Sequence, residues 1–392
     1  MGALPRDIRK TIATLAIVGI VAFAGIIVGF TFLSFPSNDI ITTTITSTTT
    51  STTTTTTNTT TTTTNGPENP PKIAIVLATG GLGDRAFNDL TYMGAEAAWI
   101  EYGWNFTYVE PTEISQYEIY LRNFAAHPNF SEPFELIICV GYDQAESLME
   151  VASEYPSQKF AIIDYYIDPE ANPNVASLLF STNECAALAG AIAGLITESD
   201  SIAFIGGMDI DVINQWLAGY IFGAEYSNPG ISSSVAYVNE WANPYAAESL
   251  ADGIYTSGTD VIMTVAGYSN LGVFDSAKKN NDTYGPLWTI GADYPQMYLG
   301  CADPENPEPP TISPTTALKR VDVAVHSIIG EVFAGSFSGG VHLFNLSNEG
   351  VDYEINTDLL TLPGSVVSVV EGLKADIIAG IVTVPDIRYW DP

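Results

Sequence analysis

Basic residues, cysteines and catalytic motifs are all scarce in this sequence. It contains 13 Lys and Arg against 45 Asp and Glu, which gives a formal net charge of −32. A surface of that charge repels phosphate backbones and anionic lipid, so we predict that the protein does not bind nucleic acid. The acidity is best interpreted as a means of keeping the protein soluble on an exposed or salty cell surface.

Cysteine and histidine are too few and too dispersed to predict a metal site. Cys139, Cys185 and Cys301 form no CxxC pair, and no histidine clusters with them. A disulfide between Cys185 and Cys301 stays open, because the sequence alone does not place the two side chains. No Ser-His-Asp order, nucleophile elbow or metal motif is present. We therefore predict that the protein is not an enzyme and needs no cofactor.

The longest apolar run lies near the N-terminus. Residues 11–33 carry no charge, and a helix of that length spans roughly 35 Å at ~1.5 Å per residue, enough to cross a hydrocarbon core of about 30 Å. Basic residues precede the run within residues 1–10, and none follows it before Lys72. The positive-inside rule predicts a cytoplasmic segment 1–10, a transmembrane anchor over 11–34 and an extracellular remainder. A cleaved signal peptide is the alternative, but the run is longer than a usual signal core.

A threonine-rich tract follows the apolar run. The chain from Thr42 to Asn65 is almost entirely Thr and has no apolar periodicity that could build a core. Residues 35–71 are therefore predicted to form a stalk of the mucin type, which would be O-glycosylated. Five Asn-x-Ser/Thr triplets also fit a glycoprotein outside the cell, at Asn58, Asn105, Asn129, Asn281 and Asn345.

From Lys72 onward, short Ile- and Val-rich runs alternate with longer helical stretches. KIAIVLAT, ELIICVG and KFAIID are followed by amphipathic segments, and the same alternation restarts at SIAFIGG. Strands that are apolar on both faces and separated by helices indicate parallel sheets covered by helices. We predict an α/β protein with two doubly wound lobes, over residues 72–198 and 199–335. Residues 336–392 are predicted to be a C-terminal crossover segment and tail.

The carboxyl ends of the predicted strands carry glycines, carboxylates, amides and aromatic rings. Ligands of open parallel sheets bind at such ends, and in two lobes these ends are expected to face each other across a cleft. This set of side chains suits a small polar ligand with a flat ring, held by hydrogen bonds and stacking. The loop beginning Thr79-Gly80-Gly81 lacks the third glycine of GxGxxG and a P-loop lysine, which disfavours phosphate binding.

Several stretches of the chain, taken in order, resemble the basic membrane protein family, which includes purine-nucleoside receptor lipoproteins. The matching stretches are GGLGDRAFND, FAIID, NECAALAGAIAGL, FIGGMDIDVINQWLAGYIFGAEY, VIMTVAGYSNLGVFDSAKK, WTIGAD and ALKRVDVAV. The resemblance implies a fold like that of type I periplasmic binding proteins, with a hinged cleft. It also implies a nucleoside ligand and an ABC transporter permease as partner.

The resemblance also supplies candidate ligand-binding residues. Those that match family positions or strand ends, together with one tryptophan in the helix that follows FIGG, are Asp84, Phe87, Asn88, Asp164, Trp216, Trp241, Gly267, Asp293 and Lys319. The sequence departs from the family pattern at Arg85 and Ala86, which replace the usual Lys-Ser, at Asn243 and at Pro295. A cysteine-anchored start is also missing. These departures bear on ligand identity more than on fold.

Several of these residues have a structural alternative. Phe87 and Trp216 could pack in the core instead of stacking on a ligand. Asp164 and Asp293 could each be an N-cap or turn carboxylate, and Lys319 could belong to an exposed salt-bridged face.

The resulting prediction is a membrane-anchored, extracellular substrate-binding protein of an ABC-type uptake transporter, which binds a nucleoside. Two alternatives stay open: a ligand-sensing surface receptor of the same fold, and a structural or adhesion protein with no small ligand.

Overall fold

The computed structural model describes residues 19–23, 26–30, 62–63 and 72–386. The chain divides into two compact units, Met1–Thr59 and Thr60–Pro392. Each unit is treated below by itself.

In the N-terminal unit, the described residues form two strands. Strand β1 (Gly19–Phe23) pairs antiparallel with β2 (Ile26–Phe30). The prediction of a helix over 11–34 is therefore wrong for the described residues, which form a strand pair. An apolar run does not by itself distinguish a helix from a strand, and the Ile, Val and Phe residues of this run favour strands. No helix in the described parts of the chain is long and apolar enough to span a membrane. The rest of 11–34 and all of the predicted stalk except Thr62–Thr63 lie outside the described residues.

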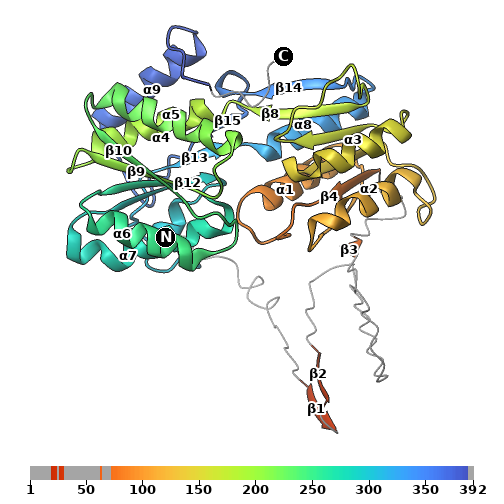
Figure 1. Cartoon of the computed structure of the whole chain (residues 1–392), viewed down its shortest axis with the longest axis horizontal. Helices are drawn as coiled ribbons and strands as arrows, with labels where there is room; N and C mark the ends of the chain where they lie inside the picture. Colours follow the sequence, from red (N-terminus) through yellow and green to blue (C-terminus); the bar gives the residue numbers. More distant parts are fainter. Residues whose placement is uncertain (1–18, 24–25, 31–61, 64–71, 387–392) are drawn as a thin grey trace, which may run out of the picture. The chain divides into compact units, whose positions relative to one another are not determined.

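The larger unit contains a seven-stranded sheet, the first sheet (Figure 1). Its order is β14-β8-β7-β6-β4-β5-β3, and every pairing is parallel except that of β3 with β5. The strands are β3 (Thr62–Thr63), β4 (Ile73–Val76), β5 (Phe106–Val109), β6 (Leu136–Val140), β7 (Phe160–Ile163), β8 (Val175–Phe180) and β14 (Gly340–Phe344).

A second, six-stranded sheet has the order β10-β9-β11-β12-β13-β15, in which only β15 runs antiparallel to its neighbour. Its strands are β9 (Ser201–Gly206), β10 (Ser232–Tyr237), β11 (Val261–Val265), β12 (Trp288–Asp293), β13 (Thr316–Lys319) and β15 (Val351–Tyr353). The predicted α/β fold with two parallel-sheet lobes is thus confirmed.

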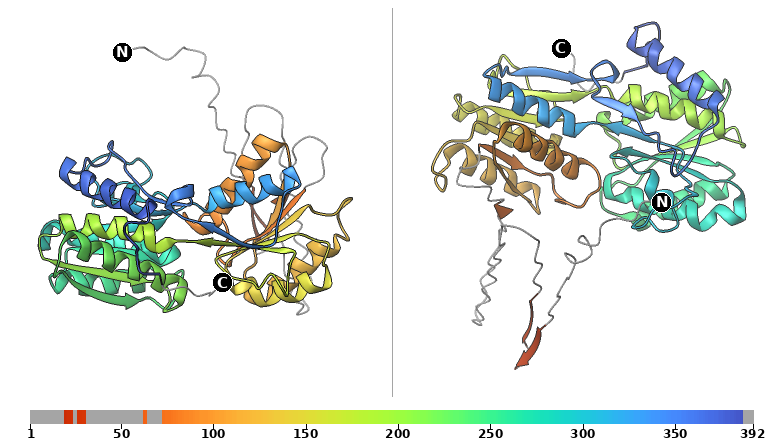
Figure 2. Two further views of the ribbon diagram at one scale, coloured as in Figure 1. Left: turned by 90° about the horizontal axis from the view of Figure 1, so that it is seen from above. Right: turned by 180° about the vertical axis from the view of Figure 1, so that it is seen from behind.

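Alternate strand residues point to opposite sides of a sheet, and here the residues on both sides are apolar and buried. Helices therefore cover both faces of each sheet. One face of the first sheet packs on α2 (Tyr117–Ala126) and α3 (Ala145–Glu154), the other on α1 (Phe87–Tyr102) and α8 (Val321–Ala334). One face of the second sheet packs on α6 (Pro244–Thr256) and α7 (Asn270–Tyr284). Its other face is covered by α4 (Thr182–Ile196), α5 (Asp211–Ser227) and α9 (Gly364–Ile378) (Figure 2).

Helices α4 and α5 approach each other closely because glycines line their contact. A Cβ atom on Gly190 would lie 2.1 Å from the Tyr220 carbonyl oxygen, and one on Gly223 would lie 1.9 Å from the Ala187 carbonyl oxygen. The AGAIAG pattern of α4 therefore serves helix packing rather than ligand binding.

The chain crosses between the two sheets three times: after β8, after β13, and between β14 and β15. Helix α4 consequently packs with the second sheet, although the expected boundary at residue 199 assigns it to the first lobe. Helix α8 packs on α1, and β14 joins the first sheet. The predicted boundaries follow chain order, whereas strand pairing between distant segments decides which sheet each element joins.

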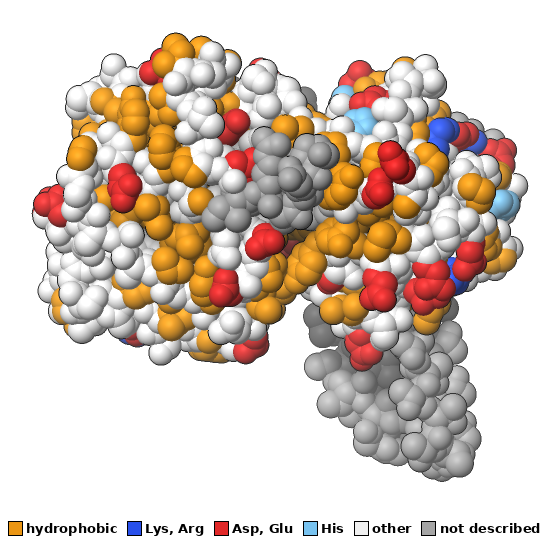
Figure 3. Space-filling view, turned by 45° about the horizontal axis from the view of Figure 1, so that its top comes forward, with side chains coloured by type: hydrophobic (Ala, Val, Ile, Leu, Met, Phe, Trp, Pro, Cys, Tyr) orange, Lys and Arg blue, Asp and Glu red, His pale blue; other side chains and the backbone are white. Residues whose placement is uncertain are grey.

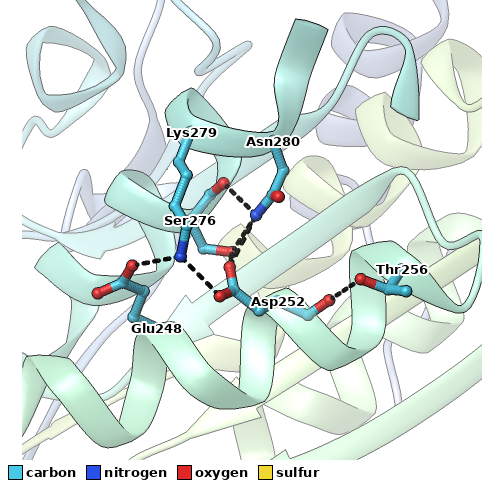
Figure 4. A network of polar contacts seen from close by, with 6 residues as sticks. All are labelled: Glu248, Asp252, Thr256, Ser276, Lys279 and Asn280. Atoms are coloured by element: carbon cyan, nitrogen blue, oxygen red, sulfur yellow. Dashed lines mark hydrogen bonds and ion pairs between the residues drawn. The ribbon is translucent and has the colours of Figure 1, made fainter. Parts of the chain in front are cut away.

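Helices α6 and α7 are joined by a polar network around Asp252 (Figure 4). Its carboxylate accepts hydrogen bonds from Ser276 Oγ at 2.7 Å, Asn280 Nδ2 at 2.7 Å and Lys279 Nζ at 2.8 Å. Partial burial raises the pKa of Asp252, but these hydrogen bonds outweigh it, and the pKa lies below its ordinary value. The charged carboxylate is thus favoured in the folded state.

We expect Asp252→Ala to lower the free energy of unfolding by about 1–2 kcal/mol, because three donors lose a charged acceptor at a partly exposed site. The stabilisation should be fully present above about pH 4 and should be lost progressively as the pH falls through the lowered pKa of the carboxylate. Urea unfolding at pH 7 and pH 3.5 measures both effects. Asp275→Ala is the control, because its ion pair with Lys278 is exposed and lies within one helix. An equal loss in the two variants would contradict the role of the network.

Candidate functional site

The predicted site residues lie mostly at the carboxyl ends of strands. Asp84, Phe87 and Asn88 follow β4, Asp164 follows β7, Trp241 follows β10, Gly267 follows β11, and Asp293 and Lys319 end β12 and β13. Trp216 lies within α5.

Lys319 joins the two sheets. It ends β13 of the second sheet, and its ammonium group forms an ion pair with the carboxylate of Asp164 at the end of β7 in the first sheet. The ammonium also lies over two aromatic rings, 4.9 Å from the centroid of Phe87 and 5.0 Å from that of Phe180. Lys319 is only 3% exposed. The alternative of an exposed salt-bridged face is therefore wrong, and Lys319 is a buried cation between aromatic rings and a carboxylate.

Asp164 retains an unused hydrogen-bond acceptor. Its backbone is left-handed, with φ of 65°, and its amide donates to the Leu178 carbonyl at 3.0 Å. One carboxylate oxygen binds Lys319, whereas the other, Oδ1, is buried and accepts no hydrogen bond in the described structure. A buried carboxylate oxygen without a donor costs free energy, so this atom is suited to accept a hydrogen bond from a ligand.

Asp293 is the equivalent residue of the second sheet. It ends β12 with φ of 66°, almost the same backbone conformation as Asp164. Burial raises its pKa to about 6; Lys319 opposes this shift, and the carboxylates of Asp164 and Asp84 add to it. A single lysine therefore does not compensate for three neighbouring carboxylates. The site favours a ligand that donates hydrogen bonds.

Asp84 and Asn88 accept hydrogen bonds from backbone amides of the segment between β4 and the first turn of α1. The Asp84 carboxylate accepts from the amides of Ala86, Asn88 and Asp89 at 2.8–3.2 Å, which satisfies the first turn of α1. Burial raises the pKa of Asp84, and the same amide bonds oppose the shift. Asn88 Oδ1 accepts from the Ala78 amide at 2.9 Å, and the residue is 2% exposed. Both side chains therefore fix the start of α1, where Phe87 lies.

An aromatic side chain lies over the strand ends of the second sheet. Trp241 is 37% exposed. A Cβ on Gly207 would come within 2.4 Å of the Trp241 ring, so glycine is required beneath the indole. Gly267, with φ of 59°, is also next to Trp241: a Cβ atom on Gly267 would lie 3.3 Å from the Trp241 carbonyl oxygen. Trp216 is instead 1% exposed and packs in the hydrophobic core.

Sequence reasoning did not identify three further residues at these strand ends. Phe180, at the end of β8, forms the second ring over Lys319. Asn270 repeats the role of Asn88 by accepting from the Ala266 amide at 2.8 Å. Gln296 is 2% exposed, and its Nε2 donates to the Arg85 carbonyl of the first lobe at 3.3 Å. Asn270 could have been found, because strand, loop and Asn recur in the same order after β4 and after β11.

The described residues contain neither a disulfide nor a cluster of side chains that could hold a metal ion. Cys139, Cys185 and Cys301 are all buried free thiols, so the disulfide considered between Cys185 and Cys301 does not form. Within residues 72–386 and the short N-terminal strands, no group of three His, Cys, Asp or Glu side chains is placed to hold a metal ion.

Comparison with known proteins now identifies the family. Residues 72–388 match the family model Bmp, described as ABC transporter substrate-binding protein PnrA-like. The chain belongs to this family. The resemblance to basic membrane proteins is thereby confirmed, and the protein is an ABC transporter substrate-binding protein of the Bmp family.

Individual relatives support the same assignment. The ABC transporter nucleoside-binding protein BmpA of Lactococcus lactis is 30% identical over 80% of this chain and 89% of its own. An uncharacterised lipoprotein of Pyrococcus horikoshii is 33% identical, over 72% of this chain and 68% of its own. A solute-binding protein of an ABC transporter system from Aeropyrum pernix has a similar structure, with a TM-score of 0.69, 26% identity and coverage of 81% of this chain and 94% of the other.

Proposed function

We propose that this Bmp-family protein binds a nucleoside between the strand ends of its two lobes and delivers it, chemically unchanged, to an ABC permease. The observation that carries the proposal is the buried, unbonded Oδ1 of Asp164 beside the Lys319 ammonium. A ribose hydroxyl can donate to such an oxygen, and charge-assisted bonds of this kind contribute roughly 1.5–3 kcal/mol each.

Phe87, Phe180 and the partly exposed Trp241 supply flat apolar surfaces at the same strand ends. Stacking of a nucleobase on an aromatic ring is worth ~1–3 kcal/mol. One stacked ring and two hydrogen bonds to carboxylates, less ordering costs, correspond to a dissociation constant on the order of micromolar or tighter. The nucleoside-binding relative in Lactococcus lactis, at 30% identity, favours the same ligand class.

Titration calorimetry with adenosine, guanosine, uridine and ribose tests the proposal. We expect at least one nucleoside to bind at least tenfold more tightly than ribose, because only the nucleoside has a base to stack. The nucleoside should be recovered intact after binding. Binding of sugars or amino acids without any nucleoside binding would refute the assignment, and recovery of an altered nucleoside would refute the non-enzymatic role.

Trp241→Ala should weaken nucleoside binding about tenfold to hundredfold, because the ligand loses one stacking surface. Trp104→Ala is the matched control, because it removes the same kind of side chain away from the carboxyl ends of the strands. Trp104 contacts Phe333, with 5.2 Å between the ring centroids, and lies before β5, at the amino end of that strand. Calorimetry of both variants gives the comparison. Equal effects of the two substitutions, or no effect of the first, would remove Trp241 from the site.

We also propose that the N-terminal segment attaches the binding unit to the outer face of the membrane. The support is the basic flank in residues 1–10 before an uncharged run. On the face shown in Figure 3, Asp and Glu side chains are scattered over the larger unit and Lys and Arg side chains are few, which suits an exposed location. Protease added to intact cells should release a fragment close in size to residues 72–392. Protection of that fragment would show the opposite orientation.

A further inference from the structure

Residues 302–310 of the second lobe form a loop that contains no strand or helix but is held in place by hydrogen bonds. Its base is closed by an isolated antiparallel bridge between Cys301 and Thr311. Its tip is held by Asp303, whose carboxylate accepts from the Glu305 amide and from Asn306 Nδ2, both at 3.0 Å. The loop therefore presents the Glu305 side chain from a fixed turn.

Local hydrogen bonds also hold the backbone of Arg85 in the first lobe. It lies in the loop before α1 with a left-handed backbone, φ of 52°. Its amide donates to Asp89 Oδ2 at 2.9 Å, and the Gly83 amide donates to Asp89 Oδ1 at 2.8 Å. Because a non-glycine residue adopts this conformation at a cost, local hydrogen bonds are needed to hold it.

These two elements meet across the lobes. The Arg85 guanidinium donates to Glu305 Oε1 at 2.8 Å and lies 5.9 Å from the centroid of the Tyr298 ring. The Arg85 carbonyl accepts from Gln296 Nε2, and the Gln296 side-chain oxygen is itself held by the Ala292 amide at 3.2 Å. Arg85 thus contacts the second lobe through both its side chain and its backbone. Arg85 and Glu305 are 37% and 75% exposed, respectively, whereas the Lys319–Asp164 pair is buried.

We propose that Arg85, Glu305, Tyr298 and Gln296 form a rim latch that holds the two lobes closed over the ligand site. The latch rests on the proposed binding function only in assuming that the lobes open and close. Because its ion pair is exposed, the latch stabilises the closed state only modestly, and salt screens this stabilisation. The latch should act mainly by slowing the opening of the lobes.

The first test measures closure directly and needs no ligand. Cysteines introduced in the full chain at Ile114 and Tyr245, which are 59% and 85% exposed near the strand ends of the two lobes, accept spin labels. The native cysteines are buried and should not react. Double electron–electron resonance then gives the populations of short and long distances. Glu305→Gln should lower the closed-to-open ratio about two- to fivefold.

Three further measurements distinguish a latch from a general effect of charge. Glu308→Gln, in the same exposed loop, removes one charge without touching Arg85 and should leave the ratio unchanged. Sodium chloride at 1 M should bring the unsubstituted protein to the ratio of Glu305→Gln. Arg85→Glu should open the protein further, and adding Glu305→Arg should restore closure. Equal ratios for the Glu305 and Glu308 variants, no rescue by the charge swap, or no short-distance population in any sample would overturn the latch.

The second test uses guanosine as the probe. Its dissociation rate, followed by stopped flow, should rise about two- to fivefold in Glu305→Gln and stay unchanged in Glu308→Gln. If guanosine does not bind at all, the nucleoside assignment is in question, while the distance measurements still decide the latch.

Discussion

Lys319→Met is expected to lower the free energy of unfolding by about 3–5 kcal/mol, because it leaves the buried Asp164 carboxylate without its counter-charge. The side chains of the pair are 3% and 9% exposed, so water cannot replace the ammonium. The same substitution should abolish measurable nucleoside binding, since it also removes the cation between the rings of Phe87 and Phe180. Urea unfolding and calorimetry give the two quantities.

The double variant Lys319→Met/Asp164→Asn separates the two effects. Asn tolerates the left-handed backbone of Asp164 and removes the uncompensated charge, so most of the lost stability should return. Binding should stay lost, because the charged acceptor is gone. A double variant as unstable as Lys319→Met alone would show that packing, rather than charge, accounts for the loss.

The second large effect concerns pH and Asp293. Its pKa of about 6 in the folded protein lies above the ordinary value of 3.8, so the ligand-free folded state binds a proton more readily than the unfolded chain. The contribution of Asp293 to the free energy of unfolding is therefore fully present below about pH 4 and is lost as the pH rises through about 6. Asp293→Asn should therefore stabilise the ligand-free protein at pH 8 by about 1–3 kcal/mol. The exposed Asp358→Asn serves as control.

Ligand binding should show the opposite dependence. In the proposed complex a ribose hydroxyl donates to the ionised carboxylate of Asp293, so nucleoside affinity should fall about tenfold per pH unit below pH 6. Asp293→Asn should bind more weakly at pH 8 and lose this pH dependence. Calorimetry between pH 5 and pH 8 measures both. Tighter binding at low pH would indicate that a protonated Asp293 donates to the ligand instead.

Much of the site follows from the order of residues in the chain. FAIID and TIGAD each end a buried strand with an aspartate, and parallel strands bring such ends to one edge of a sheet. Asp164, Asp293, Trp241 and Gly267 could therefore be selected before any coordinates were known. Trp216 shows the limit of this reasoning: its helix contains both buried and exposed positions, and only packing against the sheet shows that the indole is 1% exposed.

Other features depend on which sheet each segment joins. Helix α4 follows β8 directly but packs with α5, and α8 returns to α1 after the whole second sheet. The free energy that decides these positions comes from buried contacts between distant residues, which local patterns of hydrophobicity do not contain. The N-terminal run shows the same limit locally, because an apolar run alone does not distinguish the helix predicted over 11–34 from the strands β1 and β2.

By itself, the sequence determined the alternation of strands and helices, the strand-end carboxylates and the family, because these depend on residue type and spacing. Tertiary structure decided that Lys319 is buried between Phe87, Phe180 and Asp164, and that Arg85 reaches Glu305. Lys319 and Asp164 lie 155 residues apart in the chain, and Arg85 and Glu305 lie 220 residues apart. Only the folding of both sheets brings them within hydrogen-bonding distance, and their charges interact strongly at that range alone.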